Sequence, residues 1–284
     1  MELLTTREAM GSWSQAQAQA GLGVALVPTM GMLHQGHLAL VREARRHCQR
    51  VVVSIFVNPT QFGPNEDFAR YPRDAEGDWR LLEAAGCDAL FRPSVADIYP
   101  SDFATSVRVP DLAGELCGAL RPGHFDGVAT VVLLLLLVSR CQVACFGLKD
   151  YQQFVLIRRM VADLGVPVHL VGVPTVREPD GLALSSRNRY LTPPQRQVAP
   201  ALYAALQAAW QAWQQGETSA AVLESLARER LRQDGLERID YLSVRHRRTL
   251  RPVVRADEES VLLAAVHLGQ ARLIDNLPFS ALAD

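Results

Sequence analysis

The 284-residue chain lacks several features that mark particular classes of protein. Its net charge of −1 offers no positive field for an extended nucleic-acid site. Its strongest apolar run, residues 131–138, is far shorter than the roughly 18 to 20 residues that cross a bilayer. The first ten residues include Glu2, Arg7 and Glu8 and lack the apolar centre of a signal peptide. We therefore expect a cytoplasmic protein that binds neither nucleic acid nor a membrane.

Paired cysteines and several well-known catalytic loops are also absent from the sequence. The five cysteines are scattered and lack the C-x-x-C spacing of structural zinc sites, which predicts reduced, mostly buried thiols. There is no G-x-x-x-x-G-K-[ST] loop, no G-x-G-x-x-G loop after a predicted strand and no G-x-S-x-G nucleophile. Positioning and charge stabilisation are therefore favoured over a covalent enzyme intermediate.

Apolar and helical segments alternate through the first two thirds of the chain. Strands are predicted at residues 23–28, 51–56, 89–91, 143–146 and 168–173. Helices are predicted at residues 35–48, 74–85, 127–139 and 151–164. This alternation predicts an α/β fold with a mostly parallel sheet covered by helices on both faces. Ligands of such sheets bind beyond the carboxyl ends of the strands.

The last third of the chain has a different composition. It contains predicted helices at residues 195–215 and 220–234 and predicted strands at residues 239–244 and 261–266. These elements predict a smaller α+β domain that could act as a lid. We divide the chain into a catalytic domain, residues 1–182, and a C-terminal domain, residues 183–284.

The most informative segment follows the first of these strands and leads into a helix. It holds two imidazoles, His34 and His37, with Gly36 between them. The start of a helix attracts anions, histidine can donate to phosphate oxygens, and glycine lets the backbone approach a ligand. We interpret this turn as a site for a nucleotide triphosphate, and surface histidines at a helix start are the alternative.

A second polar loop follows the strand at residues 51–56. Asn58 and Gln61 supply amides that can donate to, and accept from, a neutral or carboxylated small molecule. A loop stabilised by an Asn-Pro turn is the alternative for Asn58. The turn-rich segment at residues 121–127 contains His124, which is a candidate for the wall of the same site. A sharp structural loop, in which His124 only caps or packs, is the alternative.

Two later loops offer groups that suit a phosphate chain. Lys149 can reach phosphate, Asp150 suits a helix cap, and Gln153 lies one helical turn beyond Lys149. Residues 184–188 combine two hydroxyls and a guanidinium in a short loop that could clamp a triphosphate. Ordinary capping and a purely structural Ser-Ser-Arg loop are the alternatives.

These motifs together resemble the pantothenate synthetase (pantoate-beta-alanine ligase) family nearly from end to end. The resemblance rests on residues 28–31, His34-x-Gly36-His37, residues 54–62, 71–73, 121–125, 146–150, 152–153, 172–174 and 180–188. It implies a Rossmann-like nucleotidyltransferase domain, a smaller C-terminal domain and a homodimer. It also implies ATP as a substrate together with Mg²⁺, and condensation of pantoate with beta-alanine through a pantoyl adenylate.

The resemblance also implies roles for individual residues. The ATP site would comprise Met30, Gly31, Met32, Leu33, His34, Gln35, Gly36, His37, Gly147, Leu148, Lys149, Asp150, Val176, Leu184, Ser185, Ser186 and Arg187. The catalytic groups would be His37, usually assigned as the proton donor, with His34 and Lys149. Pantoate would bind Gln61, Gln153 and Asn58, and beta-alanine would lie near Gln61. The magnesium ligands are not identified, although Glu76 and Asp78 are conceivable contacts.

The chain departs from the usual family pattern in one neighbourhood. Leu148 replaces a glutamate, Leu134 a lysine and Leu137 a polar residue, and Cys141-Gln142 replaces Pro-Asp. Either the helix is more fully buried here, or it exposes an apolar patch that promotes association. The alternatives for function are another nucleotidyltransferase of the same fold, a catalytically impaired variant, or a non-catalytic binding protein.

Overall fold

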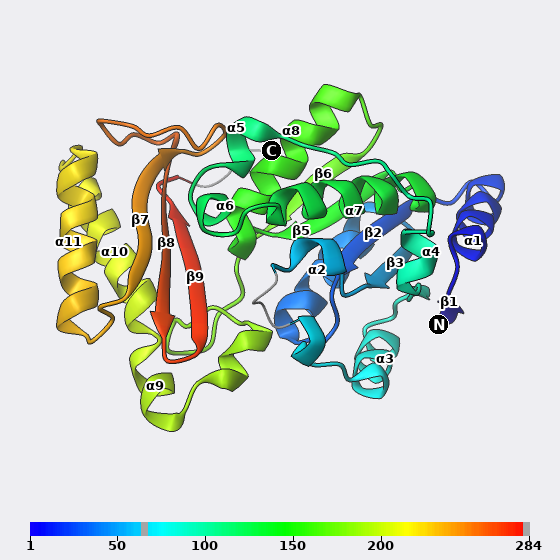
Figure 1. Cartoon of the computed structure of the whole chain (residues 1–284), viewed down its shortest axis with the longest axis horizontal. Coiled ribbons are helices and arrows are strands. Elements are labelled where there is room, and N and C mark those ends of the chain that lie inside the picture. The colour runs from blue at the N-terminus through cyan, green and yellow to red at the C-terminus, as the bar shows by residue number, and fades with distance from the viewer. Residues whose placement is uncertain (64–67, 281–284) are drawn as a thin grey trace. The chain divides into compact units, whose positions relative to one another are not determined.

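The computed structural model describes residues 1–63 and 68–280 (Figure 1). The chain folds into two compact units. Unit 1 comprises Met1–Leu148 and Leu156–Pro174, and unit 2 comprises Lys149–Val155 and Thr175–Asp284. Residue 182, the expected end of the first domain, lies inside unit 2. The two functional domains remain a prediction, and each compact unit is described by itself.

Unit 1 is built on a six-stranded parallel sheet, which confirms the predicted α/β fold. The strands, in spatial order, are β1 (Glu2–Leu4), β4 (Ala89–Phe91), β3 (Arg50–Ile55), β2 (Val24–Thr29), β5 (Val143–Gly147) and β6 (His169–Val173). Strand β1 is not among the predicted strands; it consists of a glutamate and two leucines, of which only Leu4 is buried. The central strands are buried on both faces, as parallel strands under helices must be.

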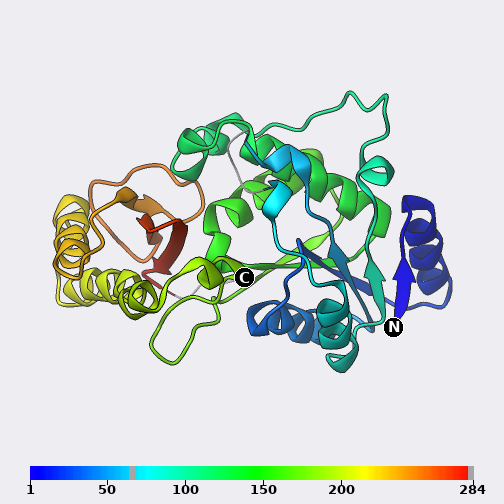
Figure 2. The same ribbon diagram turned by 60° about the horizontal axis from the view of Figure 1, so that its bottom comes forward.

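Helices cover both faces of this sheet (Figure 2). The helices from Met1 to Pro174 are α1 (Arg7–Gln19), α2 (Gln35–His47), α3 (Ala75–Ala84), α4 (Val95–Ile98), α5 (Pro110–Ala113), α6 (Cys117–Leu120), α7 (His124–Ser139) and α8 (Tyr151–Leu164), whose first residues belong to unit 2. Helices α2 and α3 bury Val41 and Leu82 against Val27 and Val53 of the sheet. Helix α7 contacts β2 and α1 and lies on the opposite face, as Figure 2 shows.

Helix α7 carries the apolar run that departs from the family pattern. Leu135 and Leu136 are buried at 4% and 3% exposure, Leu134 is half-buried, and Leu137 is 57% exposed. Most of the run therefore packs inside unit 1, and Leu137 is its principal exposed leucine. No helix within residues 1–63 and 68–280 is long and apolar enough to cross a membrane.

The five cysteine thiols are all free and buried, as the sequence predicts. Burial raises the pKa of the Cys48 thiol. It raises the pKa values of Cys87 and Cys141 to about 11 and the pKa of Cys145 to about 12. Because the thiolate is the reactive form, these side chains behave as small apolar groups at neutral pH.

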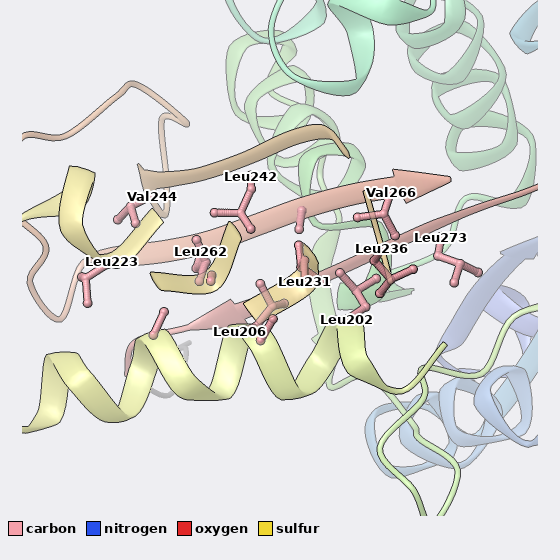
Figure 3. Packing of buried hydrophobic residues seen from close by; sticks show 14 of the residues in the cluster. Leu202, Leu206, Leu223, Leu231, Leu236, Leu242, Val244, Leu262, Val266 and Leu273 are labelled. Carbon is pink, nitrogen blue, oxygen red and sulfur yellow. The ribbon is translucent and has the colours of Figure 1, made fainter. Parts of the chain in front are cut away.

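Unit 2 packs helices against a three-stranded antiparallel sheet in the order β7-β8-β9 (Figure 3). Its strands are β7 (Ile239–His246), β8 (Ser260–Leu268) and β9 (Ala271–Pro278). Leu206 of α10 (Ala201–Gln214) and Leu223 of α11 (Ala220–Gln233) pack in one core with Leu262 and Leu273. This arrangement confirms the smaller α+β part of the fold.

Two elements of unit 2 differ from the sequence prediction. The single helix predicted at residues 195–215 is two helices, α9 (Pro193–Val198) and α10, because Pro200 has no N–H to continue the hydrogen-bond ladder. Strand β9 is not among the predicted strands, and its register with β8 places it at the edge of the sheet.

The burial of α7 is testable with two leucines two positions apart. Leu135→Ala should lower the free energy of unfolding by about 2–5 kcal/mol, because it opens a cavity in the core. Leu137→Ala should change it by less than about 0.5 kcal/mol, because that side chain is largely exposed. Urea-induced unfolding measures both values, and equal losses would contradict this placement of the helix.

Candidate active site

The candidate residues of unit 1 gather at the point beside β2 where the order of the strands in the sheet reverses. From β2 the chain proceeds to β3 and β4 on one side, whereas β5 lies on the other side of β2. Leu26 pairs with Ala144, and the strands end three residues further on, at Thr29 and Gly147. Thr29 also pairs with Ile55, the last residue of β3. The loops after β2, β3 and β5 therefore leave the same edge, at the switch point where such sheets bind ligands.

The turn after β2 depends on a carboxylate from α3. Gly31 has a φ of +85° and Met32 a φ of +53°, which side chains rarely adopt. Asp78 Oδ2 accepts from the Met32 N–H at 2.9 Å, and Asp78 Oδ1 accepts from the Leu33 N–H at 2.7 Å. A Cβ on residue 31 would lie 2.9 Å from Asp78 Oδ2, so glycine is required there. Asp78 holds the turn in its unusual conformation.

The Asp78 carboxylate is only 4% exposed. Burial raises the pKa of Asp78 above the ordinary aspartate value, whereas the hydrogen bonds from Leu33 and Met32 lower it. Both of its oxygens accept backbone N–H groups. We therefore interpret Asp78 as an anchor of the turn rather than as the conceivable metal contact considered from the sequence.

His34 and His37 form the N-terminal cap of α2. His34 Nδ1 accepts from the Gly36 N–H at 3.2 Å, and His37 Nδ1 accepts from the His34 N–H at 3.3 Å. The two ring centroids lie 4.1 Å apart. Because each Nδ1 accepts a hydrogen bond, a neutral ring carries its hydrogen on Nε2. The cap thus fixes both tautomers and makes each Nε2 a donor.

Asn58 organises the loop after β3. Its Nδ2 donates to Gly127 O at 3.1 Å and to Gln61 Oε1 at 3.2 Å, and its Oδ1 accepts from Tyr99 Oη at 2.9 Å and Thr60 Oγ1 at 2.9 Å. Asn58 is 1% exposed. The bond to Oε1 fixes the amide of Gln61 so that its Nε2 faces Met30 Sδ at 3.0 Å. The loop is thereby joined to the first residue of the turn after β2.

The start of α7 supports the same loop. A Cβ on Gly127 would lie 2.5 Å from Thr60 O, so only glycine allows this close approach. His124 Nδ1 lies 2.7 Å from Gln61 O, and Arg121 Nη1 lies 3.0 Å from His124 Nε2. Since a carbonyl can only accept, His124 carries a hydrogen on Nδ1 and accepts from Arg121 on Nε2. The candidate wall residue His124 therefore holds the backbone of Gln61.

Gly147, at the end of β5, and Leu148 still belong to unit 1, and the remaining candidate residues belong to unit 2. Lys149 lies in a short 3₁₀ turn, Leu148–Asp150, that precedes α8, and its Nζ is 3.8 Å from Asp150 Oδ2. The helix begins at Tyr151, as the sequence predicts, so Lys149 lies just before it. Gln153 is half-buried in the first turn of α8. Asn276 Nδ2 donates to Lys149 O at 3.1 Å.

Val176 and Leu184 face each other across a hairpin in unit 2. The Leu184 N–H donates to Val176 O at 3.0 Å, and Arg177 and Ala183 form a bridge inside the hairpin. Ser185 then caps a 3₁₀ helix, Ser186–Tyr190, by accepting from the Arg187 N–H at 3.3 Å. The backbone near Val176 and the Leu184–Arg187 loop are therefore one hydrogen-bonded substructure.

Comparison with known proteins identifies the family. The model of the pantoate-beta-alanine ligase family matches residues 2–278. The chain belongs to this family. It is 58% identical over 283 residues to the pantothenate synthetase of Magnetococcus marinus, covering 99% of this chain and 97% of that protein.

Solved structures of the same family have the same fold. The pantothenate synthetase of Thermus thermophilus is 50% identical, with a TM-score of 0.92 over 99% of this chain and 100% of that one. The pantoate-beta-alanine ligase of Francisella tularensis, solved with beta-gamma ATP and beta-alanine, is 32% identical, with a TM-score of 0.79 over 98% of each chain. The family resemblance and the fold class inferred from the sequence are thus confirmed.

Two residues that depart from the family pattern, Leu148 and Gln142, each suit their surroundings in this structure. Leu148 is buried at 7% exposure, so a leucine suits its position. Gln142 Oε1 accepts from the Val24 N–H at 2.7 Å and joins the starts of β2 and β5. Among the described residues, no three or more His, Cys, Asp and Glu side chains are arranged to hold a metal ion.

Sequence reasoning missed the residues that position the site. Tyr99, Asn276 and the anchoring role of Asp78 gave no local signal, because their partners are distant in the sequence. An acidic residue in the first turn of a helix is ordinary, and it did not reveal a partner 45 residues away.

The anchoring of the turn by Asp78 is testable with two isosteric substitutions in one segment. Asp78→Asn should lower the free energy of unfolding by about 1–3 kcal/mol, because an amide NH₂ group would face a backbone N–H. Amide hydrogen exchange at Met32 and Leu33 should accelerate. Asp74→Asn is the control, since asparagine caps a helix as well as aspartate does. Equal stability and unchanged exchange in both variants would contradict the anchor.

Proposed function

We propose that this protein condenses (R)-pantoate with beta-alanine and consumes ATP. The products are pantothenate, AMP and pyrophosphate, and the intermediate is pantoyl adenylate. Membership of the pantoate-beta-alanine ligase family supports the reaction. The structural observation that carries the proposal is the His34–His37 cap, with both Nε2 atoms set as donors at the same sheet edge as Gln61.

The residues proposed for each substrate are those inferred from the sequence. ATP is bound by the Met30–His37 turn, by Gly147, Leu148, Lys149 and Asp150, by the backbone near Val176, and by Leu184, Ser185, Ser186 and Arg187. The N–H groups of Met32 and Leu33 already donate to Asp78, so these residues contact ATP through other atoms. Pantoate binds Gln61 and Gln153, while Asn58 acts by orienting Gln61.

In the first step, a carboxylate oxygen of pantoate attacks the α-phosphorus of ATP, and the bond to the β-phosphate oxygen breaks. Negative charge grows on the phosphate oxygens and on the leaving pyrophosphate. The Nε2–H groups of His34 and His37 and the ammonium of Lys149 stabilise that charge. Pyrophosphate is already a good leaving group, so charge stabilisation outweighs proton donation by His37.

In the second step, the neutral amine of beta-alanine attacks the acyl carbon of pantoyl adenylate, the bond from that carbon to the phosphate oxygen of AMP breaks, and the nitrogen releases a proton to solvent. Adenylation is needed because a free carboxylate would have to expel oxide. Gln61 Nε2 is held next to Met30 by Asn58, in a position from which it can bind the carboxylate of either substrate. The rigid amide of Gln61 thus serves both steps.

Mg²⁺ binds together with the phosphates of ATP in this proposal. Magnesium sites commonly use one or two carboxylates plus substrate phosphates rather than a cage of protein ligands. Mg²⁺ would neutralise phosphate charge there. We also propose a homodimer and a cytoplasmic location, where ATP is supplied.

The two half-reactions test the proposed function. With ATP and pantoate alone, the protein should release pyrophosphate, at most about one equivalent per site in the first turnover. AMP and pantothenate should appear only after beta-alanine is added. A pyrophosphate assay and chromatography of the nucleotides measure both steps. Absence of turnover with all three substrates would refute the proposal, and turnover with a phosphorylated acceptor would favour another nucleotidyltransferase.

The role of His37 has its own test. His37→Ala should lower the rate of adenylation about 100- to 1,000-fold, the typical effect of losing one preorganised transition-state contact. His47→Ala is the matched control, because His47 lies at the other end of α2 and pairs with Glu43 at the surface. Single-turnover pyrophosphate release compares the two variants. A near-normal rate for His37→Ala would exclude its role.

A further inference from the structure

Two consecutive residues of β9, Asp275 and Asn276, are buried although both are polar. Each is 4% exposed, in a sheet whose other buried positions are mostly apolar. Aspartate and asparagine are depleted in strands, and burying them costs free energy unless their polar atoms are hydrogen-bonded. Successive strand residues point to opposite faces, so this pair can reach two different segments of unit 2.

Asp275 binds the hairpin that carries Val176 and Leu184. Its carboxylate accepts from Arg177 Nη1 at 2.6 Å and from Arg177 Nη2 at 2.8 Å, a two-pronged ion pair. Arg177 also donates to Gly181 O at 3.1 Å, and its guanidinium lies 3.5 Å from the ring centroid of Tyr203. The position of the hairpin is therefore fixed relative to β9.

Asn276 binds the other candidate segment of unit 2. Its Nδ2 donates to Lys149 O at 3.1 Å, and its backbone N–H donates to Asp275 Oδ1 at 2.8 Å. Two residues beyond Lys149, Tyr151 Oη donates to Arg247 O at 3.1 Å. The segment Lys149–Tyr151 is thus held by one contact with β9 and one with the residue that follows β7.

We infer that Asp275 and Asn276 are positioning residues that set the spacing between Lys149 and the Val176–Leu184 hairpin. This inference rests on the proposed function, in which both segments bind ATP. Neither residue touches the substrate. A buried ion pair is weak evidence for stability, because desolvation offsets its attraction, so geometric precision is the better account of its presence here.

Asn276→Ala removes the contact with Lys149 and leaves the ion pair of Asp275 in place. We expect the KM for ATP to rise about 10-fold and the rate of adenylation to fall about 10-fold, while the KM for beta-alanine stays within twofold. Asp240→Asn is the matched control: Asp240 binds His267 and Arg272 in the same sheet and belongs to no candidate segment. It should change these constants less than twofold.

Arg177→Lys provides the second arm, because it keeps the charge and loses the two-pronged geometry. We expect a rise of about fivefold in the KM for ATP. In the double variant, which combines Asn276→Ala with Arg177→Lys, the rise in the KM for ATP should be smaller than the product of the two single rises. Both substitutions disturb the same spacing. If Asn276→Ala and Arg177→Lys melt at temperatures close to that of Asp240→Asn, their kinetic changes come from lost positioning rather than from general destabilisation.

Binding of β,γ-methylene-ATP to the full chain, measured by calorimetry without pantoate, separates this inference from the proposed function. Weaker binding by Asn276→Ala than by Asp240→Asn supports the positioning role even if no pantothenate is formed. Equal ATP affinity and equal adenylation in the two variants would overturn it. A wild-type chain that binds the analogue but makes no pantothenate would contradict the proposed function alone.

Discussion

Two hydrogen bonds from a loop to one buried carboxylate determine the start of the candidate active site. Without Asp78, the Met32 and Leu33 N–H groups would be left without these acceptors in a backbone conformation that side chains disfavour. The turn ends directly at His34, so its geometry sets where α2 begins and how the two imidazoles cap it. The placement of α3 therefore influences where α2 begins, which tautomers His34 and His37 adopt, and where their Nε2–H groups point.

Local patterns allowed much of the fold and the chemistry to be predicted. Apolar strands alternating with helices identified the parallel sheet, and the His34-x-Gly36-His37 spacing identified the turn after β2. The residues that position those groups could not be predicted in the same way. Asp78 and Asn276 meet their partners only in the folded chain, 45 or more residues away. Proline at position 200 split a helix whose composition suggested continuity.

The same physical device recurs in both units. In unit 1, Asn58 uses its amide to hold Gln61, and Gly127 lets α7 approach that loop closely. In unit 2, Asp275 and Asn276 hold the hairpin and the backbone of Lys149. In these contacts, buried amides of Asn58 and Asn276 bind carbonyl oxygens, and the buried carboxylate of Asp275 binds a guanidinium. Groups proposed to meet substrate are thus supported by residues that do not.

The buried thiols make this chain a convenient object for spectroscopy. All five native cysteines are shielded, and those at 48, 87, 141 and 145 also resist ionisation. A cysteine introduced on an exposed side chain of each unit, such as Leu137 in unit 1 and Val254 in unit 2, would react far faster than the native five. Paired spin labels or fluorophores at such positions could report the separation of the units during turnover, without first removing any natural cysteine.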